Sequence, residues 1–150
     1  MPDTFTDFLE AVKTRLAADA NFSDSPAVAV LADDEGDFEK RFEQQLAKCT
    51  VVAVVFVLDW VENPAELTGE LTFAVNVIES GGKNRTAQRT GYRTARQLAQ
   101  AARNSLRNWA PAISGETDVW QAIESQRVHL VAKEPEINWQ LTGKCLRQLA

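Results

Sequence analysis

The sequence predicts a single α+β domain, residues 1–150, in which a mixed or antiparallel sheet is covered on one face by two principal helices. A length of 150 residues is that of one domain, and 45% hydrophobic with 25% charged residues is ordinary for a globular chain. Two long segments carry apolar residues at helical spacing, and several short apolar or alternating runs are typical of strands. The expected order is α-β-α-β-β-α-β-β.

The first helix is expected over residues 4–19, because apolar side chains recur there at steps of three and four. These side chains are Phe5, Phe8, Leu9, Val12 and Leu16. A short buried strand is expected at 27–31. An acidic turn follows, and then a short helix in which Phe38, Phe42 and Leu46 are spaced by four.

The centre of the chain predicts a strand hairpin. Residues 50–60 are nearly all apolar and rich in valine, which is typical of a central strand covered on both faces. The pair Asn63-Pro64, within residues 61–67, is expected to end that strand. Residues 69–79 alternate between apolar and polar side chains, so we expect a half-buried strand paired antiparallel with the preceding one.

A long helix is expected over residues 90–109, with Pro111 ending it. Its apolar face consists of Tyr92, Ala95, Leu98, Ala99, Ala102, Leu106 and Trp109. Residues 119–125 fit a helical turn and a strand equally well. A strand is expected at 128–131, and a last strand begins at Ile137, where apolar and polar residues alternate again.

The ends and the cysteines predict a compartment. No basic segment followed by an apolar run begins the chain, so no signal peptide is expected. No apolar stretch approaches the roughly 20 residues that span a bilayer, so no membrane partner is expected. Cys49 and Cys145 match no zinc or redox spacing and are expected to be reduced, buried thiols. We therefore expect the protein in the cytoplasm when it is made.

The residues that could support catalysis are few. The single histidine, His129, has no nucleophile and no orienting carboxylate near it in the sequence. Its position in the expected strand favours an exposed or cross-strand side chain on the face opposite Val128 and Leu130. Zinc motifs of the HExxH type need two histidines and are excluded. We therefore expect no enzymatic activity and no catalytic residue.

Two further patterns resemble ligand sites and fail on spacing. The pair Gly82-Lys83 lacks both the earlier glycine and the following Ser or Thr of a Walker phosphate loop. An acidic cluster in the first third of the chain lacks the full ligand spacing of an EF-hand, which favours a solvated turn. That cluster is Asp33, Asp34, Glu35 and Asp37. No metal and no cofactor is expected.

The distribution of charge is the most informative feature of the sequence. The chain carries 16 basic and 21 acidic residues, a net charge of −5. The segment 80–115 holds seven of the basic residues and no acidic one, so it carries +7 and the remainder −12. The basic residues of this segment are Lys83, Arg85, Arg89, Arg93, Arg96, Arg103 and Arg107. These seven are the candidate interaction residues.

At about 100° per residue, the five arginines from Arg89 to Arg107 fall in one stripe beside the apolar face of the expected helix. Arginine suits contacts with carboxylates and phosphates, because its planar fork meets them in bidentate geometry. Three interpretations remain open for this stripe. It pairs with acids of its own chain, it contacts the acidic surface of another subunit, or it binds nucleic acid. Nucleic acid is the least favoured, because the acidic body repels phosphates and aromatic residues are not interleaved among the stripe arginines as stacking platforms would be.

The middle and end of the chain carry short motifs in a familiar order. They are Phe73-Ala74-Val75-Asn76-Val77-Ile78-Glu79, Lys83-Asn84-Arg85, Gly91-Tyr92, Asn108-Trp109-Ala110-Pro111 and Asn138-Trp139-Gln140-Leu141. In these motifs and in element order over residues 4–145, the chain resembles the tail-completion or tail-terminator family of Mu-like contractile-tailed bacteriophages and prophages. The resemblance implies a small α+β structural protein without catalytic residues.

The resemblance also implies a place of action and partners. Such a protein caps the end of the tail tube as a ring, expected to be a hexamer, and contacts the tail tube and the neck proteins. It would act in the cytoplasm of the bacterial host during assembly and then remain in the virion tail. A subunit with a basic stripe and an acidic body offers two unlike patches, which a head-to-tail ring requires. The loop 80–91 is expected to order against a neighbouring subunit or the tube.

Overall fold

The computed structural model describes residues 4–23, 28–32, 37–48, 51–80, 93–111, 120–123, 125–134 and 136–148. The elements in chain order are α1 (Thr4–Ala18), α2 (Ala20–Ser23), β1 (Val28–Ala32), α3 (Phe38–Lys48), β2 (Val51–Asn63), β3 (Thr68–Glu79), α5 (Ala95–Leu106), β4 (Ser125–Ala132) and β5 (Ile137–Gln148). The class is α+β, with a five-stranded mixed sheet. The order differs from the predicted one by the four-residue helix α2.

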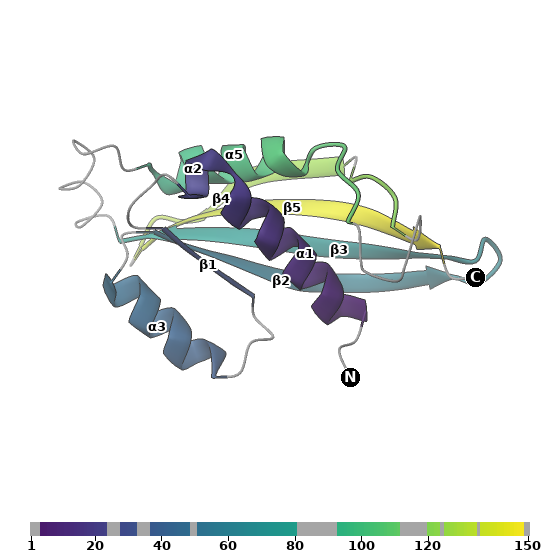
Figure 1. Ribbon diagram of the computed structural model, residues 1–150, viewed down its shortest axis with the longest axis horizontal. Helices are drawn as coiled ribbons and strands as arrows, with labels where there is room; N and C mark the ends of the chain where they lie inside the picture. The colour runs from purple at the N-terminus through teal and green to yellow at the C-terminus, as the bar shows by residue number, and fades with distance from the viewer. Residues whose placement is uncertain are drawn as a thin grey trace.

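The sheet has the strand order β1-β2-β3-β5-β4. The strand β1 runs parallel to β2, with Val28 opposite Val51, and every other pair in the sheet is antiparallel. The strand β5 therefore lies between β3 and β4, so that the last strand of the sequence is an interior strand of the sheet. The long strands β2, β3 and β5 extend well past β1 toward one end of the molecule (Figure 1).

Helices lie on both sides of this sheet. In Figure 1, α1 crosses in front of the strands, α2 and α5 lie along the upper part of the molecule, and α3 lies below β1 and β2. The helices α1 and α5 pack on the main core, and α3 packs on the opposite face. The sequence predicted two principal helices on one face and did not predict the position of α3. The aromatic side chains Phe38 and Phe42 of α3 pack on Val52 and Val54, which point away from α1 because successive strand residues face opposite sides.

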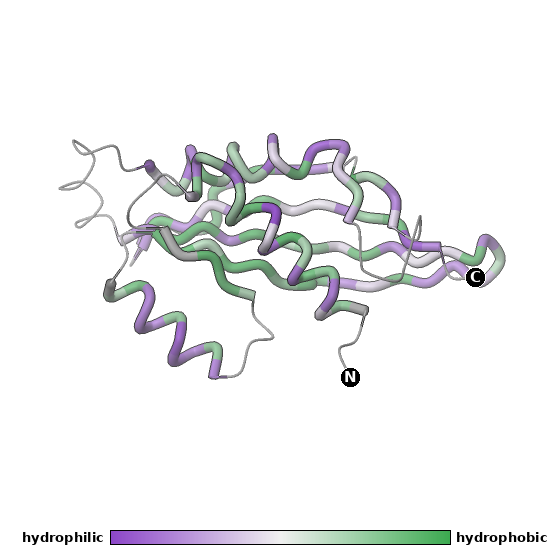
Figure 2. The backbone as a smooth tube through the Cα atoms, viewed as in Figure 1, coloured by the Kyte–Doolittle hydropathy of each residue, from purple (hydrophilic) through white to green (hydrophobic). Residues whose placement is uncertain are grey.

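The main core lies between the sheet and the helices α1 and α5. It is built from Phe8 and Val12 of α1, Leu98 of α5, and the alternate strand residues Phe73 and Leu141, all fully buried. Aromatic rings meet inside it, with the Phe8 and Phe73 centroids 5.4 Å apart. Figure 2 shows hydrophobic residues concentrated along β1 and the part of β2 beside it, under this layer.

Several predicted boundaries are wrong. The strand β2 continues to Asn63 instead of ending near Trp60, and Pro64 opens the turn after it. The helix α5 begins at Ala95 and not at 90, because Thr94 caps it. Its predicted apolar residue Trp109 lies beyond the last helical residue.

The C-terminal third resolves one open alternative. Within the described residues 120–123, neither a helix nor a strand forms, and Trp120 makes a single bridge with Arg147. The strands β4 and β5 are both longer than predicted. Within β5, Gly143 leaves room for the ring of Phe73. The predicted loop 80–91, the acids Asp33 to Glu35 and the thiol Cys49 lie outside the described residues, apart from Ser80.

Candidate interaction surface

The helix α5 is positioned by its N-terminus. The Thr94 hydroxyl accepts a hydrogen bond from the Gln97 backbone amide at 3.2 Å, and the Gln97 side chain accepts one from the Thr94 amide at 2.9 Å. The two bonds satisfy backbone donors that the first helical turn leaves unpaired. The buried Glu79 carboxylate, at the end of β3, accepts a further bond from the Ala95 amide at 3.2 Å. A carboxylate at this position also interacts favourably with the helix dipole.

The structure divides the predicted arginine stripe. Lys83, Arg85 and Arg89 lie outside the described residues. Arg96, Arg103 and Arg107 are exposed and lie within about 40° of one another around the α5 axis. We call these three residues the α5 arginine stripe.

The fourth described arginine of the predicted set, Arg93, lies apart from this stripe. It precedes the Thr94 cap, and its side chain lines a groove beside α5 whose lining does not include the α5 arginine stripe. In the described part of the chain, neither Arg93 nor the stripe forms an ion pair. The one hydrogen bond of the set joins Arg103 Nη2 to Asn104 Oδ1 at 3.4 Å. Of the four described members of the predicted set, Arg93 thus lines the groove, and Arg96, Arg103 and Arg107 do not.

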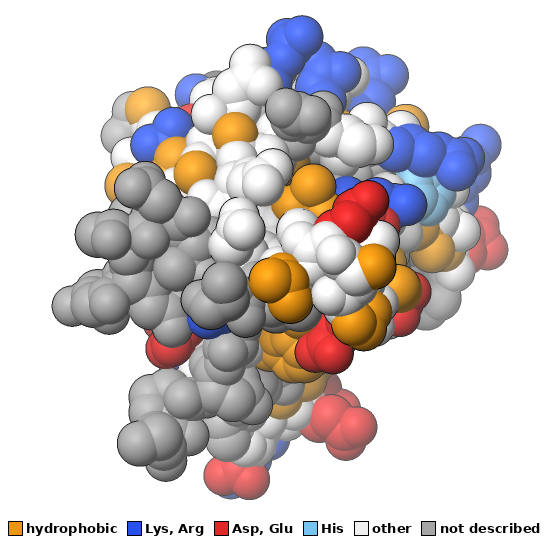
Figure 3. All heavy atoms as spheres, turned by 90° about the vertical axis from the view of Figure 1, so that its right-hand side faces the viewer, with side chains coloured by type: hydrophobic (Ala, Val, Ile, Leu, Met, Phe, Trp, Pro, Cys, Tyr) orange, Lys and Arg blue, Asp and Glu red, His pale blue; other side chains and the backbone are white. Residues whose placement is uncertain are grey.

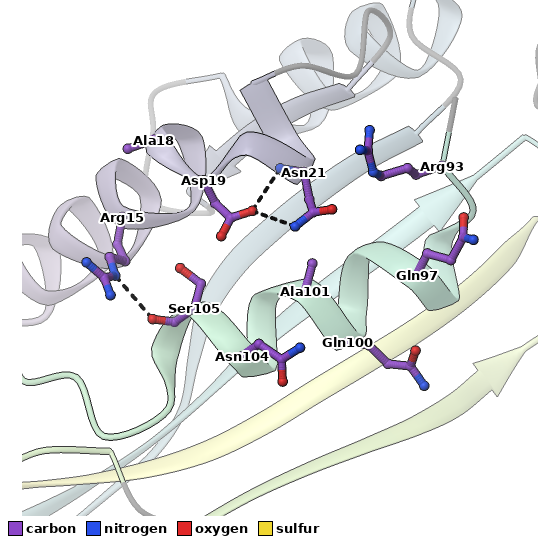
Figure 4. Close-up of a pocket in the computed structure, with 10 residues that line it drawn as sticks. All are labelled: Arg15, Ala18, Asp19, Asn21, Arg93, Gln97, Gln100, Ala101, Asn104 and Ser105. Carbon is purple, nitrogen blue, oxygen red and sulfur yellow. Dashed lines mark hydrogen bonds between the residues drawn. The ribbon is translucent and has the colours of Figure 1, made fainter. Parts of the chain in front are cut away.

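The groove lies between α5 and the end of α1 with α2, and its volume is about 720 Å³ (Figure 4). Its lining is Arg15, Ala18, Asp19, Asn21, Arg93, Gln97, Gln100, Ala101, Asn104 and Ser105. In Figure 4, Asp19 and Asn21 reach from the α1–α2 side toward Ala101, and Arg93 reaches toward Asn21 from the other side. Two guanidinium groups and several amides around a floor of small residues suit a carboxylate-bearing chain segment.

Two groove side chains are held in place by contacts with neighbouring residues. Arg15 donates from Nε to the Ser105 carbonyl oxygen at 3.1 Å, and its guanidinium lies 5.5 Å from the ring centroid of Trp109. The Asp19 carboxylate accepts bonds from the backbone and side-chain nitrogens of Asn21 at 2.9 and 3.0 Å. One oxygen of the one acid in the groove is thus already engaged.

The sequence did not predict this groove. Arg15 and Ser105 are 90 positions apart, and no local pattern links them. The one local signal in the sequence was Arg15, a basic residue in the last turn of α1 beside the apolar face of that helix.

A second surface lies at the turn between β2 and β3. The exposed side chains there are the aliphatic Leu58, Val61 and Leu67 and the acidic Asp59, Glu62 and Glu66. We call this set the acidic tip. Leu67 is 52% exposed and Val61 57% exposed, so neither contributes much to the core. Figure 3 faces this end of the molecule and shows hydrophobic and acidic side chains gathered there, with arginines and lysines toward the top and right.

The backbone of the acidic tip carries strain at one residue. Leu67 has a φ of 51°, in the left-handed region that glycine and asparagine favour. A residue with a Cβ pays about 1–2 kcal/mol for this conformation. Nothing in the core compensates, because the Leu67 side chain is largely exposed.

The remaining candidate groups do not assemble a reactive site. His129 faces away from the main core and lies opposite Gln140 on β5, as its strand position predicted. Among the described residues, no group of three or more His, Cys, Asp or Glu side chains could hold a metal ion. Burial raises the pKa of the Cys145 thiol to about 12, and its Sγ donates to the Gln121 carbonyl oxygen at 3.0 Å. A protonated, buried thiol is a poor nucleophile.

No helix in the described part of the chain has the length and apolar character needed to cross a membrane. Searches against models of known protein families and against curated protein sequences gave no match to this chain. The chemistry of the surface is therefore inferred from the residues of this chain.

Proposed function

We propose that the protein is a non-enzymatic structural protein of a phage or prophage tail, which caps the tail tube as a ring and contacts the neck proteins. The observation that carries the proposal is the presence of two surfaces of unlike charge on one small subunit, neither of which forms an ion pair within the described residues. Arginines lie on and beside α5, and the acidic tip presents Glu62 and Glu66 among exposed aliphatic side chains.

This arrangement favours head-to-tail association of identical subunits. Identical subunits joined through two different patches form a closed ring when the rotation between neighbours closes, and an open filament when it does not. Opposite charges on the two patches speed encounter and disfavour wrong orientations. The resemblance of Asn108-Trp109-Ala110-Pro111 and the other short motifs to tail-terminator proteins supports a ring at the end of a tail tube.

The ring is tested by the solution mass of the purified chain and by negative-stain electron microscopy. We expect a closed ring of six subunits with a central opening, alone or on isolated tail tubes. A chain that stays monomeric at high concentration and does not bind the end of a tail tube would overturn the proposal.

A nucleic-acid-binding domain is the second candidate, because the exposed α5 arginine stripe could contact phosphates. A salt titration of DNA binding separates the two. For the second candidate, we expect micromolar or tighter affinity with a log–log slope of about −4 or steeper, since each neutralised phosphate releases counterions. Absence of binding at low salt removes this candidate. Loss of binding in an Arg96→Glu, Arg103→Glu double variant would assign it to the stripe.

A further inference from the structure

We infer that the groove between α1–α2 and α5 is the docking site for the acidic tip of a second copy of this chain. The inference rests on the proposed function, and it names the two surfaces through which neighbouring subunits would meet. Three observations support the inference. They are the charge and shape of the groove, the composition of the acidic tip, and the position of groove and tip toward opposite ends of one molecule.

The groove offers what a carboxylate-bearing turn requires. Arg93 lines it without an ion pair in the described part of the chain, and Arg15 lines it with a guanidinium fixed beside Trp109. The small side chains Ala18 and Ala101 leave room between them for an aliphatic side chain. Gln97 and Asn21 carry amides, which can both donate to and accept from the backbone of an incoming turn.

The tip supplies the matching groups. Glu66 lies in the turn itself, and Glu62 lies one residue before its first member, Asn63. Leu67 stands in the left-handed region, 52% exposed, where a glycine would relieve the backbone. Leu67 destabilises the folded chain through its backbone conformation and contributes little to the core. Such a side chain is suited to burial against a partner.

The two surfaces cannot meet within one molecule. In Figure 1, the β2–β3 turn lies at the right-hand end, and α2 with the first turn of α5 lies toward the left. Rigid strands of the central sheet separate them. Each subunit therefore offers one tip and one groove, and contact between them is head to tail.

The α5 arginine stripe is the alternative receptor for the tip, and it provides the matched control. Arg93→Glu and Arg96→Glu change the charge equally, three positions apart, and only Arg93 lines the groove. We expect Arg93→Glu to raise the subunit dissociation constant about tenfold or more, because a glutamate would face the acidic tip. Arg96→Glu should change the dissociation constant by no more than about twofold. For the tip, Glu66→Arg is the disruptive change, and Glu134→Arg, at an exposed residue between β4 and β5 outside both surfaces, is its control with an expected change of no more than about twofold.

Charge exchange then identifies the pair. The Arg93→Glu chain and the Glu66→Arg chain should each assemble poorly alone and assemble when mixed, since each tip then finds a groove of opposite charge. The double variant carrying both changes should assemble by itself. Analytical ultracentrifugation measures all four samples.

Leu67→Gly tests whether Leu67 serves assembly or the stability of the fold. If Leu67 stabilised the fold, its removal would lower the thermal unfolding midpoint. At a dilution where the chain is monomeric, we expect its thermal unfolding midpoint to rise by about 2–4 °C, because glycine relieves the left-handed backbone. Its assembly should nevertheless weaken about tenfold. Asn108→Gly, which relieves a φ of 55° outside both surfaces, should leave assembly unchanged.

The outcomes separate the inference from the proposed function. Assembly that survives Arg93→Glu, or that fails equally with Arg96→Glu, overturns the docking and leaves the ring intact. Absence of rescue in the mixed sample also overturns it. A wild-type chain that never associates overturns the ring and the docking together.

Discussion

The inner and outer halves of the β2–β3 hairpin have similar aliphatic side chains and opposite environments. Val51 to Val55 are buried, whereas Leu58, Val61 and Leu67 are exposed. The difference arises because β1 pairs with β2 only as far as Val55 and ends there, and because α3 covers that inner half alone. One strand thus builds the core along its first half and presents a surface along its second, with a register shift between Val57 and Asp59.

The largest effect should come from removing a ring in the core half. Phe73→Ala deletes a fully buried side chain that meets Phe8 with a centroid distance of 5.4 Å. We expect the free energy of unfolding to fall by about 3–5 kcal/mol in chemical denaturation. Leu58→Ala, in the outer half, is the control and should change it by less than about 0.5 kcal/mol. Equal losses would mean that the two halves are not distinct.

Replacing a glycine by alanine should also destabilise the two regions unequally, by a smaller amount than the loss of Phe73. A Cβ on Gly143 would lie 2.7 Å from Phe73 Cζ, so Gly143→Ala should cost about 1–3 kcal/mol of stability. A Cβ on Gly69 would overlap the indole of Trp60, which is only partly buried, whereas Phe73 is fully buried. Displacing a partly buried ring disturbs less packing, so we expect Gly69→Ala to cost less than Gly143→Ala. Urea denaturation measures the stability of both variants. Adding Phe73→Leu should restore part of the stability lost in Gly143→Ala and none of that lost in Gly69→Ala.

A pH titration probes the buried side of the outer half, where Cys145 pairs with Leu71. Its thiol has a pKa raised from 9.0 to about 12, so the folded state holds the proton more tightly than the unfolded state. Stability from this group is full below pH 9 and is lost as pH rises toward 12. We expect the wild type to lose about 1 kcal/mol more than Cys145→Ala between pH 9.5 and 10.5. Parallel curves would contradict the burial.

The smallest expected effect concerns the exposed aliphatic residues. Val61→Ser removes apolar surface that is already 57% exposed, so the unfolding free energy of the monomer should change by less than about 0.5 kcal/mol. Its self-association should weaken, since the lost surface belongs to the acidic tip. Sedimentation of the variant beside the wild type measures this. A clear loss of monomer stability would assign Val61 to the core.

Periodicity predicted the elements better than their limits. The spacing of Phe5 to Leu16 located α1, and alternation located β3, because both patterns reflect a single face packed on one core. The end of β2 was mispredicted at Trp60. Pro64 stops a strand locally, but pairing with β3 continues as far as Asn63 because the partner strand supplies the hydrogen bonds.

The charged surface was predicted only in part. The run of arginines without acids is a property of the sequence, and Arg96, Arg103 and Arg107 do share one side of α5. The separation of Arg93 from them depends on the Thr94 cap, which starts the helix after it. That Arg93 and Arg15 line the same groove depends on α1 packing beside α5.

The sequence by itself determined the α+β class, the amphipathic helices and the uneven distribution of charge, because each depends on residues close together in the chain. The tertiary structure decided which strands are neighbours, the placement of α3 on the second face and the formation of the groove. Those features join segments as far apart as Arg15 and Ser105. They depend on how the elements pack against one another, which local spacing does not specify.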